Sequence, residues 1–342
     1  MGIPLIQQFY ISCYIMRQRL RRKRRYPLVL MLEPLFRCNL ACAGCGKIDY
    51  PEEVLDRQLS VAECLSAVDE CGAPVVSIAG GEPLLHEDMP QIVEGIVRRK
   101  KFVYLCTNGL LLRKCIHAFS PSPYFSFSVH LDGNRNRHDA LVCRTGVFDA
   151  AVEAIRLARS KGFRVTINCT LYKGVAAPEV AGFFDFVTGL GVEGITVAPG
   201  FRQKPDESQE VFLDRSSSVK LFREIFKLGK GRKWNFNHTK LYLDLLAGNS
   251  NYRCTPWGNP TRNIFGWQKP CYLLGDEGHA SSFEALMEET DWEAYGTGRN
   301  AKCVNCMLHS GFEPTAVNEM FIHPFKALGL AIYGLIICGL NA

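Results

Sequence analysis

Three cysteines stand close together early in the chain, in the run Cys38-Asn-Leu-Ala-Cys42-Ala-Gly-Cys45. Thiolates at such short spacing are the ligands that iron–sulfur clusters use. Three ligands are one fewer than the irons of a [4Fe–4S] cluster, so one iron would stay open to a substrate or cofactor. A zinc site usually has four protein ligands, and buried thiols without a metal are the remaining interpretation. We expect Cys38, Cys42 and Cys45 to hold a catalytic [4Fe–4S] cluster.

A second candidate motif is Gly80-Gly81-Glu82-Pro83, which follows a short apolar run at residues 75–79. Glycine lets a backbone approach a ligand closely, and the carboxylate of Glu82 can accept hydrogen bonds from an ammonium group. Alone, this motif also makes an ordinary turn. Its place one strand–helix unit after the cysteine run favours a binding role for Gly80, Gly81 and Glu82.

The elements that must position these motifs are six apolar runs of strand length, which alternate with helical segments. They lie at residues 27–33, 75–79, 102–106, 124–130, 163–171 and 194–198. Strands and helices in alternation form parallel βα units, so we expect an α/β fold, a partial (β/α)6 relative of the TIM barrel. Both motifs follow the C-terminal end of a predicted strand, where barrel enzymes place their chemistry. This predicts one active site at one mouth.

Composition divides the chain into four parts: a basic, partly apolar segment at 1–25, a core at 26–200, a small cysteine-containing C-terminal domain at 201–325 and an apolar tail at 326–342. In the C-terminal domain we predict a linker at 201–218 and helices at 219–228 and 240–246. Its cysteines Cys254, Cys271, Cys303 and Cys306 include one pair at metal-ligand spacing. They are candidates for a second metal site, with a core of reduced thiols as the alternative.

The net charge is only +6, but seven basic residues fall between Arg17 and Arg25. The rest of the chain is nearly neutral, which argues against nucleic-acid binding. The basic run is either a solvated helix or arm, or a surface helix on anionic lipid, where each cation contributes about 1 kcal/mol. Apolar residues precede the charges, the reverse of a secretory signal. Together with fifteen cysteines, several of them at metal-like spacings, this predicts a cytoplasmic protein in peripheral contact with the inner face of the membrane.

Together, the cysteine run and the Gly-Gly-Glu-Pro motif resemble the cluster loop and cofactor motif of radical S-adenosylmethionine (radical SAM) enzymes. The resemblance implies that SAM, a co-substrate, chelates the open iron and that Gly80, Gly81 and Glu82 bind its amino group. Asn108 and Ser128, near the ends of the third and fourth predicted strands, match positions that meet the SAM ribose or its surroundings. A strand-end turn is the alternative role for both.

Longer stretches resemble the adenosyl-hopene transferases, the hopanoid-biosynthesis branch of radical SAM enzymes. The resemblance extends over about residues 3–325 and is carried by Tyr26–Glu53, Ser77–Leu84, Tyr104–Gly109, Cys254–Asn263, Gly266–Leu274 and Cys306–Val317. Two features depart from the family. Ser310 stands where the family usually has cysteine, and the tail after Lys326 is unusually apolar.

This resemblance implies that a 5′-deoxyadenosyl radical from SAM adds to the terminal alkene of the triterpene diploptene (hopene), giving adenosylhopane. It also implies an electron donor such as flavodoxin or ferredoxin. The carbon radical formed must then be quenched, and the neutral thiol of Cys106, at the end of a predicted strand, is our candidate hydrogen donor, since an S–H bond is weaker than the C–H bond formed. Cysteine is also a common buried residue, so an inert wall thiol is the alternative.

The sequence leaves two other functions open. The C-terminal cysteines suggest a radical SAM maturase that acts on a peptide or protein. Such an enzyme predicts an acidic or peptide-sized groove, whereas a lipid substrate predicts an apolar cavity. A non-catalytic iron–sulfur or zinc scaffold is the other alternative, although a scaffold has no need of Glu82 beside paired glycines.

Overall fold

The structure is a computed structural model that describes residues 2–201 and 211–322. In this part of the chain one sheet has the strand order β6-β5-β4-β3-β2-β1-β7-β8-β9. Its parallel portion comprises β1 (Val29–Leu32), β2 (Val75–Ile78), β3 (Phe102–Thr107), β4 (Phe125–His130), β5 (Arg164–Leu171) and β6 (Gly194–Pro199). Because β6 ends the sheet instead of pairing with β1, the barrel is open on one side. The predicted α/β partial barrel is confirmed.

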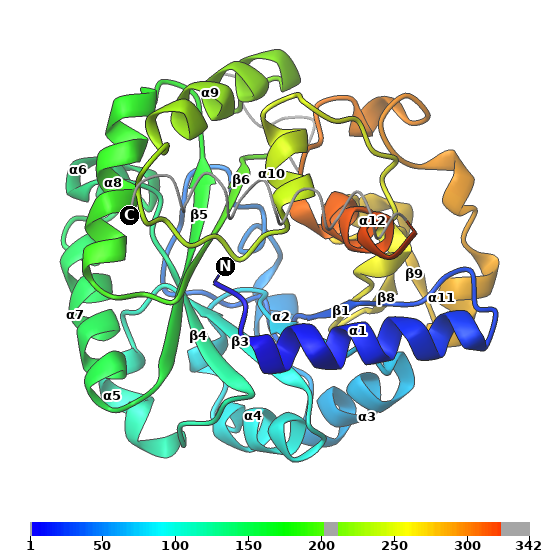
Figure 1. Cartoon of the computed structure of the whole chain (residues 1–342). Coiled ribbons are helices and arrows are strands. Elements are labelled where there is room, and N and C mark those ends of the chain that lie inside the picture. Colours follow the sequence, from blue (N-terminus) through cyan, green and yellow to red (C-terminus); the bar gives the residue numbers. More distant parts are fainter. Residues whose placement is uncertain (1, 202–210, 323–342) are drawn as a thin grey trace.

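Helices cover the outer face of the parallel strands (Figure 1). They are α3 (Val61–Cys71), α4 (Met89–Arg98), α5 (Leu112–Cys115), α6 (Arg135–Leu141), α7 (Val147–Ser160) and α8 (Ala177–Gly189), whereas the short α2 (Glu52–Leu55) follows the cysteine loop and buries none of its residues. Helix α3 begins with a capping box: Ser60 accepts from the Glu63 N–H at 3.3 Å, and the Glu63 carboxylate accepts from the Ser60 N–H at 2.8 Å. Gly72 ends this helix at φ 67°, a conformation that glycine adopts readily.

Side-chain alternation divides each parallel strand between the core and the barrel interior. In β4, Phe125, Phe127 and Val129 belong to the main hydrophobic core under the helices. The residues between them, Ser126, Ser128 and His130, therefore point into the barrel. The interior of the barrel thus carries hydroxyl, thiol and imidazole groups within an apolar wall.

The C-terminal region adds helices and a small antiparallel extension to the same sheet. Its elements are α9 (Arg215–Leu228), α10 (Lys240–Leu246), β7 (Thr261–Asn263), β8 (Gly266–Gln268), β9 (His279–Ala280), α11 (Phe283–Glu289) and α12 (His309–Ile322). Strand β7 pairs in parallel with β1, with Met31 opposite Thr261. The C-terminal region is therefore joined to the barrel at the strand that leads into the cysteine run. The predicted apolar tail at 326–342 lies outside the described residues.

One predicted boundary is wrong. Residues 215–218 were assigned to a linker, but α9 begins at Arg215. The side chain of Asp214 accepts a hydrogen bond from the Ser217 N–H at 2.8 Å, which is the usual N-cap contact. The serines that suggested a linker instead form the first turn of a capped helix, where Ser and Asp are favoured.

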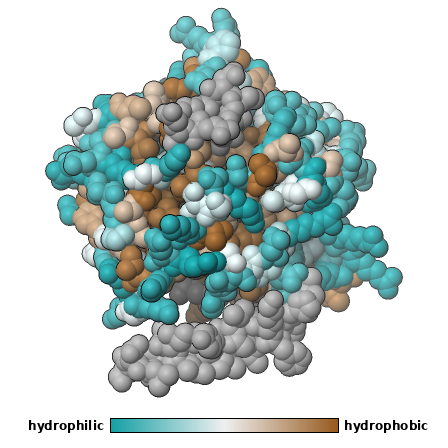
Figure 2. Space-filling view, turned by 90° about the horizontal axis from the view of Figure 1, so that it is seen from above, coloured by the Kyte–Doolittle hydropathy of each residue, from teal (hydrophilic) through white to brown (hydrophobic). Residues whose placement is uncertain are grey.

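Helix α1 (Leu5–Leu20) crosses the N-terminal ends of the strands, in front of the sheet in Figure 1 and next to α12. The ring of its Tyr10 packs against Phe102 and Tyr124, at the beginnings of β3 and β4. Seen from the side of α9, hydrophilic residues occupy much of the rim and hydrophobic ones gather in the middle of the face (Figure 2). None of the helices in residues 2–201 and 211–322 has the length and apolar character needed to cross a bilayer.

Candidate active site

The loop after β1 places the three cysteines of the predicted cluster site at the C-terminal end of the barrel. Cys38 and Cys42 are partly buried and Cys45 is exposed. Burial raises the pKa of Cys38 to about 11, and burial together with the neighbouring thiols Cys45 and Cys38 raises the pKa of Cys42 to about 12. These mutual effects show that the three thiols share one region. They are held as protonated thiols until a metal displaces the protons.

This donor set fits a cluster better than a single ion. Within the described ranges, no three His, Cys, Asp or Glu side chains converge closely enough to hold one metal ion. Around tetrahedral zinc, with Zn–S of about 2.3 Å, thiolates converge to roughly 4 Å from one another. In a four-iron cluster each thiolate binds a different iron atom, so its thiolates lie further from one another than those around a single zinc ion. Three thiols in one loop without tight convergence suit that larger group.

The paired glycines position the cysteine loop. A Cβ on Gly80 would lie 2.3 Å from the carbonyl oxygen of Leu35, and one on Gly81 would lie 2.1 Å from that of Arg37. The N–H groups of Gly81 and Glu82 donate to these two carbonyls, both at 3.0 Å. Only residues without a side chain allow the end of β2 to approach the backbone just before Cys38 this closely. A contact of these glycines with SAM stays a prediction.

Glu82 is almost completely buried, with 1% of its surface exposed. Its carboxylate accepts hydrogen bonds from the Thr107 hydroxyl at 2.7 Å, the Asn108 N–H at 2.8 Å and the Leu84 N–H at 3.1 Å. Burial raises the pKa of this carboxyl, although these donors act in the opposite direction. The side chain therefore ties the end of β2 to the end of β3. Its predicted contact with the SAM ammonium would use the oxygen lone pairs that remain.

Asn108 links the third strand to the cysteine loop. Its amide donates to the side-chain oxygen of Asn39 at 2.7 Å, and its own oxygen accepts from the Leu110 N–H at 3.0 Å. Because Asn39 directly follows Cys38, this bond fixes the beginning of the cluster loop. The structure thus brings Asn108 next to the predicted cluster ligands, as a positioning residue whose ribose contact stays a prediction.

Cys106 and Ser128 are neighbours inside the barrel, since they are register partners on β3 and β4. The hydroxyl of Ser77, on β2, lies 3.7 Å from the Cys106 sulfur, in a hydrogen bond that either group can donate. Burial raises the pKa of the Cys106 thiol, so the thiol stays protonated at neutral pH. The predicted donor is therefore a neutral thiol between two hydroxyls, on the inner face of the strands.

A histidine–aspartate pair at the same mouth was missed as a site feature. Nε2 of His130 lies 2.6 Å from the Asp132 carboxylate, which also accepts from the Thr170 N–H at 2.7 Å. Burial lowers the pKa of His130, but Asp132 and Glu82 together outweigh it and raise the pKa. The spacing of the strand indicates His130, because it is two residues beyond Ser128 and so points to the same face of the strand.

A buried ion pair between Lys47 and Glu33 holds the cysteine loop near Cys45. The sequence did not lead us to predict this pair. The Lys47 ammonium lies 2.8 Å from the Glu33 carboxylate, which is 2% exposed on its side chain. The same ammonium sits 4.9 Å from the centre of the Phe36 ring. A buried carboxylate must be paired or hydrogen-bonded, so Glu33 at the end of β1 holds the far side of the cysteine loop through Lys47.

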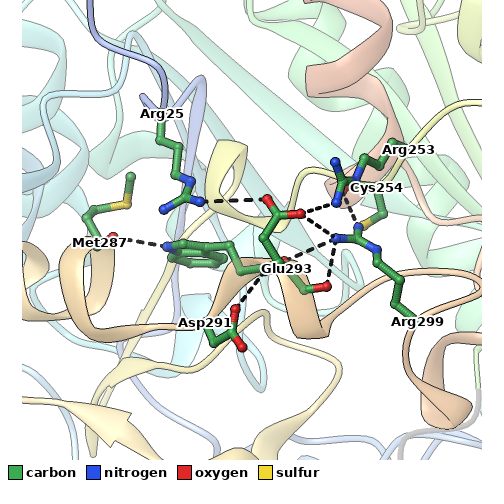
Figure 3. Close-up of polar contacts among 8 residues, drawn as sticks. Arg25, Arg253, Cys254, Met287, Asp291, Glu293 and Arg299 are labelled. Carbon is green, nitrogen blue, oxygen red and sulfur yellow. Dashed lines mark hydrogen bonds and ion pairs between the residues drawn. The ribbon is translucent and has the colours of Figure 1, made fainter.

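The C-terminal cysteines also come together. Cys254, Cys271, Cys303 and Cys306 line a single cavity of about 30 Å³, and Ser310 lies in the same cavity. Burial raises the pKa of Cys271 and of Cys306 to about 12, with further contributions from neighbouring thiols of the set. Arg299 donates to the backbone oxygens of Cys254 at 3.4 Å and of Glu293 at 3.0 Å (Figure 3). The fold thus gathers thiols that are far apart in sequence.

Comparison with known proteins agrees with this geometry. The radical SAM superfamily matches residues 32–187, and a domain of unknown function, DUF3463, matches residues 195–330. The GTP 3′,8-cyclase of Aquifex aeolicus is 31% identical over 173 residues, which are 48% of this chain and 54% of that enzyme. The Fe-coproporphyrin III synthase of Methanosarcina barkeri is 28% identical over 40% of this chain and 35% of its own. This chain thus spans about half or less of these two relatives.

Solved structures show the same fold over most of the chain. SuiB of Streptococcus suis, bound to its precursor peptide SuiA, superposes with a TM-score of 0.67 at 16% identity and covers 88% of this chain and 74% of its own. Native anSMEcpe with bound AdoMet superposes with a TM-score of 0.61 at 16% identity and covers 90% of this chain and all of its own. On this evidence, the chain carries a radical SAM superfamily domain over residues 32–187.

Proposed function

We propose that this protein is an adenosyl-hopene transferase, which joins the 5′-deoxyadenosyl group of SAM to the terminal alkene of diploptene to give adenosylhopane. The stretches that resemble this family extend over about residues 3–325 and include the C-terminal cysteines. The observation that carries the proposal is the neutral thiol of Cys106, which faces the barrel interior between Ser77 and Ser128. Addition to an alkene, unlike cyclisation or oxidation, leaves a carbon radical that needs a hydrogen donor.

Cys38, Cys42 and Cys45 would hold a [4Fe–4S] cluster, which would supply the one electron needed to cleave SAM to methionine and the 5′-deoxyadenosyl radical. The radical forms a C–C bond at the terminal carbon of the alkene and leaves a tertiary carbon radical. Cys106 transfers its hydrogen atom to that carbon. The sulfur radical left behind is restored by one electron and one proton, with flavodoxin or ferredoxin as the proposed electron source.

The remaining residues of the site orient the reactants and exclude water. Glu82 presents buried negative charge near Cys38, suited to an ammonium group. His130 and its partner Asp132 lie at the same end of the strands and can hold hydroxyl groups of the ribose. Lys47 keeps the cysteine loop closed through Glu33. The protein thus supplies geometry and electrostatics, while the bound groups supply the difficult chemistry.

The second set of cysteines is proposed to hold a further iron–sulfur cluster. Four thiols line one cavity, yet they do not converge on a point as zinc ligands would. Thiolates are the ligands that iron–sulfur clusters use, so four of them on one cavity suit such a cluster. Ser310, at the position where the family usually has cysteine, faces this cavity as well. The cluster would lie in the C-terminal region beside the barrel, since Phe201, just after β6, lines the cavity too.

Modification of a peptide is the second candidate function, and the cavity with four cysteines is the observation that favours it. One assay separates the candidates. The anaerobically reconstituted protein would be incubated with SAM, reduced flavodoxin and either diploptene or no lipid, and the products identified by mass spectrometry. We expect a saturated adenosyl adduct of diploptene. Cleavage of SAM to 5′-deoxyadenosine without any adduct would reject the hopene substrate but retain a radical SAM enzyme, and no cleavage at all would favour a scaffold.

A further inference from the structure

Helix α1 has its polar and apolar faces reversed relative to an ordinary surface helix. Towards the barrel it buries Gln7 and Gln18, which are 3% and 9% exposed. At 3.6 residues per turn, four large apolar side chains share about 60° of arc on the opposite side. This "α1 stripe" is formed by Leu5 (81% exposed), Phe9 (66%), Met16 (57%) and Leu20 (82%). A continuous apolar stripe facing water marks an interaction surface.

Exposed apolar side chains are concentrated on this helix. Of the twelve large hydrophobic side chains exposed in the described part of the chain, six belong to α1: Leu5, Ile6, Phe9, Tyr10, Met16 and Leu20. The other six are spread over the rest of the surface, at Tyr50, Phe186, Leu228, Phe265, Val304 and Met320. Singly exposed apolar residues are normal in soluble proteins. The concentration on α1 therefore needs an explanation of its own.

The charge of α1 itself and of the segment after it is entirely positive. Residues 2–32 contain no aspartate or glutamate, and the basic run between 17 and 25 forms the end of the helix and the segment after it. Two of its seven cations are used within the protein. Arg25 pairs with Glu293 at 3.7 Å (Figure 3), and Arg19 donates to the Asn318 carbonyl at 3.2 Å. Five are exposed and form no ion pair with a described residue: Arg17, Arg21, Arg22, Lys23 and Arg24.

We propose that α1 is an interfacial membrane-binding helix, whose stripe inserts among the lipids of an anionic bilayer while the basic run contacts their headgroups. Combined apolar insertion and cationic attraction is how monotopic helices bind membranes. A second copy of this chain is a poor occupant, because two identical basic surfaces would repel each other. The helix would lie in the membrane surface, with its long axis parallel to it.

The barrel holds α1 in a fixed orientation, so the stripe is preformed. The Tyr104 hydroxyl, inside the barrel, donates to the Gln7 side chain at 2.9 Å. Ile15 is fully buried in a cluster with Tyr26 and Leu28. A helix that is already folded and oriented loses little conformational entropy when it inserts. At the same place α12 ends, with the Phe321 ring under Arg19, and residues 327–340, which follow in the sequence, are apolar.

Membrane docking through α1 is separate from the active site. The helix covers the N-terminal ends of the strands, whereas the cysteine loop lies at their C-terminal ends. The proposal rests on α1 alone and holds for any substrate. Substitutions in the stripe should therefore leave the binding of SAM in solution unchanged.

The test is sedimentation of the full-length protein with vesicles of phosphatidylcholine containing phosphatidylglycerol, at low and high salt. The stripe variant Leu5→Gln/Phe9→Gln/Leu20→Gln and the charge variant Arg21→Gln/Arg22→Gln/Arg24→Gln are compared with the wild type. The matched control is Phe186→Gln/Val304→Gln, which removes exposed apolar side chains far from α1. Thermal unfolding of each protein checks that it is folded. Gel filtration of each protein reports its oligomeric state.

We expect the wild type and the control to bind anionic vesicles. The stripe variant and the charge variant should each bind at least about tenfold more weakly than the wild type. High salt should weaken vesicle binding of the wild type more than that of the charge variant, which has three fewer exposed cations to be screened. A folded stripe variant that binds like the wild type would overturn the proposal, as would equal loss in the control. A wild type that ignores vesicles but forms a complex or dimer that the stripe variant does not form would assign the surface to a protein partner instead.

Discussion

The two groups of cysteines in this protein are assembled in opposite ways. Cys38, Cys42 and Cys45 belong to one loop of eight residues, which follows β1 and reaches the surface at Cys45. The second group comes from segments up to about fifty residues apart and lines an internal cavity, with Cys306 9% exposed. The first group can adjust to a ligand as a loop does, whereas the second is fixed by the packing of β8, α12 and the turns between them.

The difference explains how much of each site the sequence revealed. Local spacing makes the first group recognisable, because a short loop confines its thiols whatever the fold. In the second group only Cys303 and Cys306 stand at metal-ligand spacing, three residues apart, although all four cysteines were candidates. Its other two thiols reach the cavity because the β7–β8 hairpin pairs with β1 and because Arg299 holds the Cys254 backbone. No periodicity in the sequence encodes those contacts.

The largest effect is expected from the first group. Cys42→Ala should abolish SAM cleavage, because two thiolates hold a four-iron cluster poorly, and the anaerobic protein should lose one cluster's worth of iron. The measurement is 5′-deoxyadenosine formation alongside iron counting. The control is Cys143→Ala, which removes an exposed thiol outside the loop. Full turnover by Cys42→Ala would remove the cluster from the mechanism.

A smaller effect on cleavage should come from the second group. Cys303→Ala and Cys306→Ala should each lower the bound iron by up to one further cluster, while SAM cleavage persists within a few-fold. Cys64→Ala serves as the control, since Cys64 belongs to α3, is 0% exposed and lies in the main core. If the wild type binds only one cluster's worth of metal, or if both variants keep its full metal content, the second group is a core of reduced thiols.

Most of the barrel was predictable, because each of its strands is marked by residues that are close together in the sequence. Each parallel strand is an apolar run followed by a polar or glycine-containing turn, so its existence can be read within ten residues. The predicted linker is wrong at residues 215–218, because Asp214 and the serines after it are equally common in turns and in helix caps. The site residues His130 and Lys47 were missed for a different reason: each pairs with an acid close by in the sequence, Asp132 or Glu33, and a single histidine or lysine near an acid is too common to mark a site.

Glu82→Gln should weaken the binding of SAM without removing the cluster. The amide keeps the shape of the side chain but replaces one charged acceptor by an NH2 group, which then faces the N–H of Asn108 or of Leu84. Hydrogen bonds to charged groups contribute about 1.5–3 kcal/mol, so SAM should bind at least about tenfold more weakly, with an unchanged cluster spectrum. Equilibrium binding of SAM is the measurement, and Glu94→Gln, on the exposed face of α4, is the control. Equal affinities in both would leave Glu82 a purely structural tie.

Replacing Cys106, a thiol that belongs to neither group, should have the smallest effect on SAM cleavage. Its effect on the product should be the most specific. Cys106 faces the barrel interior, while Cys169, on β5, faces the helices and is 1% exposed in the core. Cys106→Ala should cleave SAM at the wild-type rate and still join the fragments. Without the hydrogen donor, the tertiary radical should end as reductant adducts or as an alkene. Cys169→Ala should give only the saturated product.

The pH dependence sharpens this last prediction. Burial raises the pKa of the Cys106 thiol, so the hydrogen-carrying form persists as the pH increases, and the donor is lost only above the ordinary thiol range of about 8.5. The fraction of saturated product in the wild type should therefore stay constant between about pH 6 and 8. A fraction that falls within this range would mean that the thiol ionises there. Saturated product from Cys106→Ala at the wild-type rate would show that the hydrogen atom comes from another group and that Cys106, like Cys169, serves only the barrel wall.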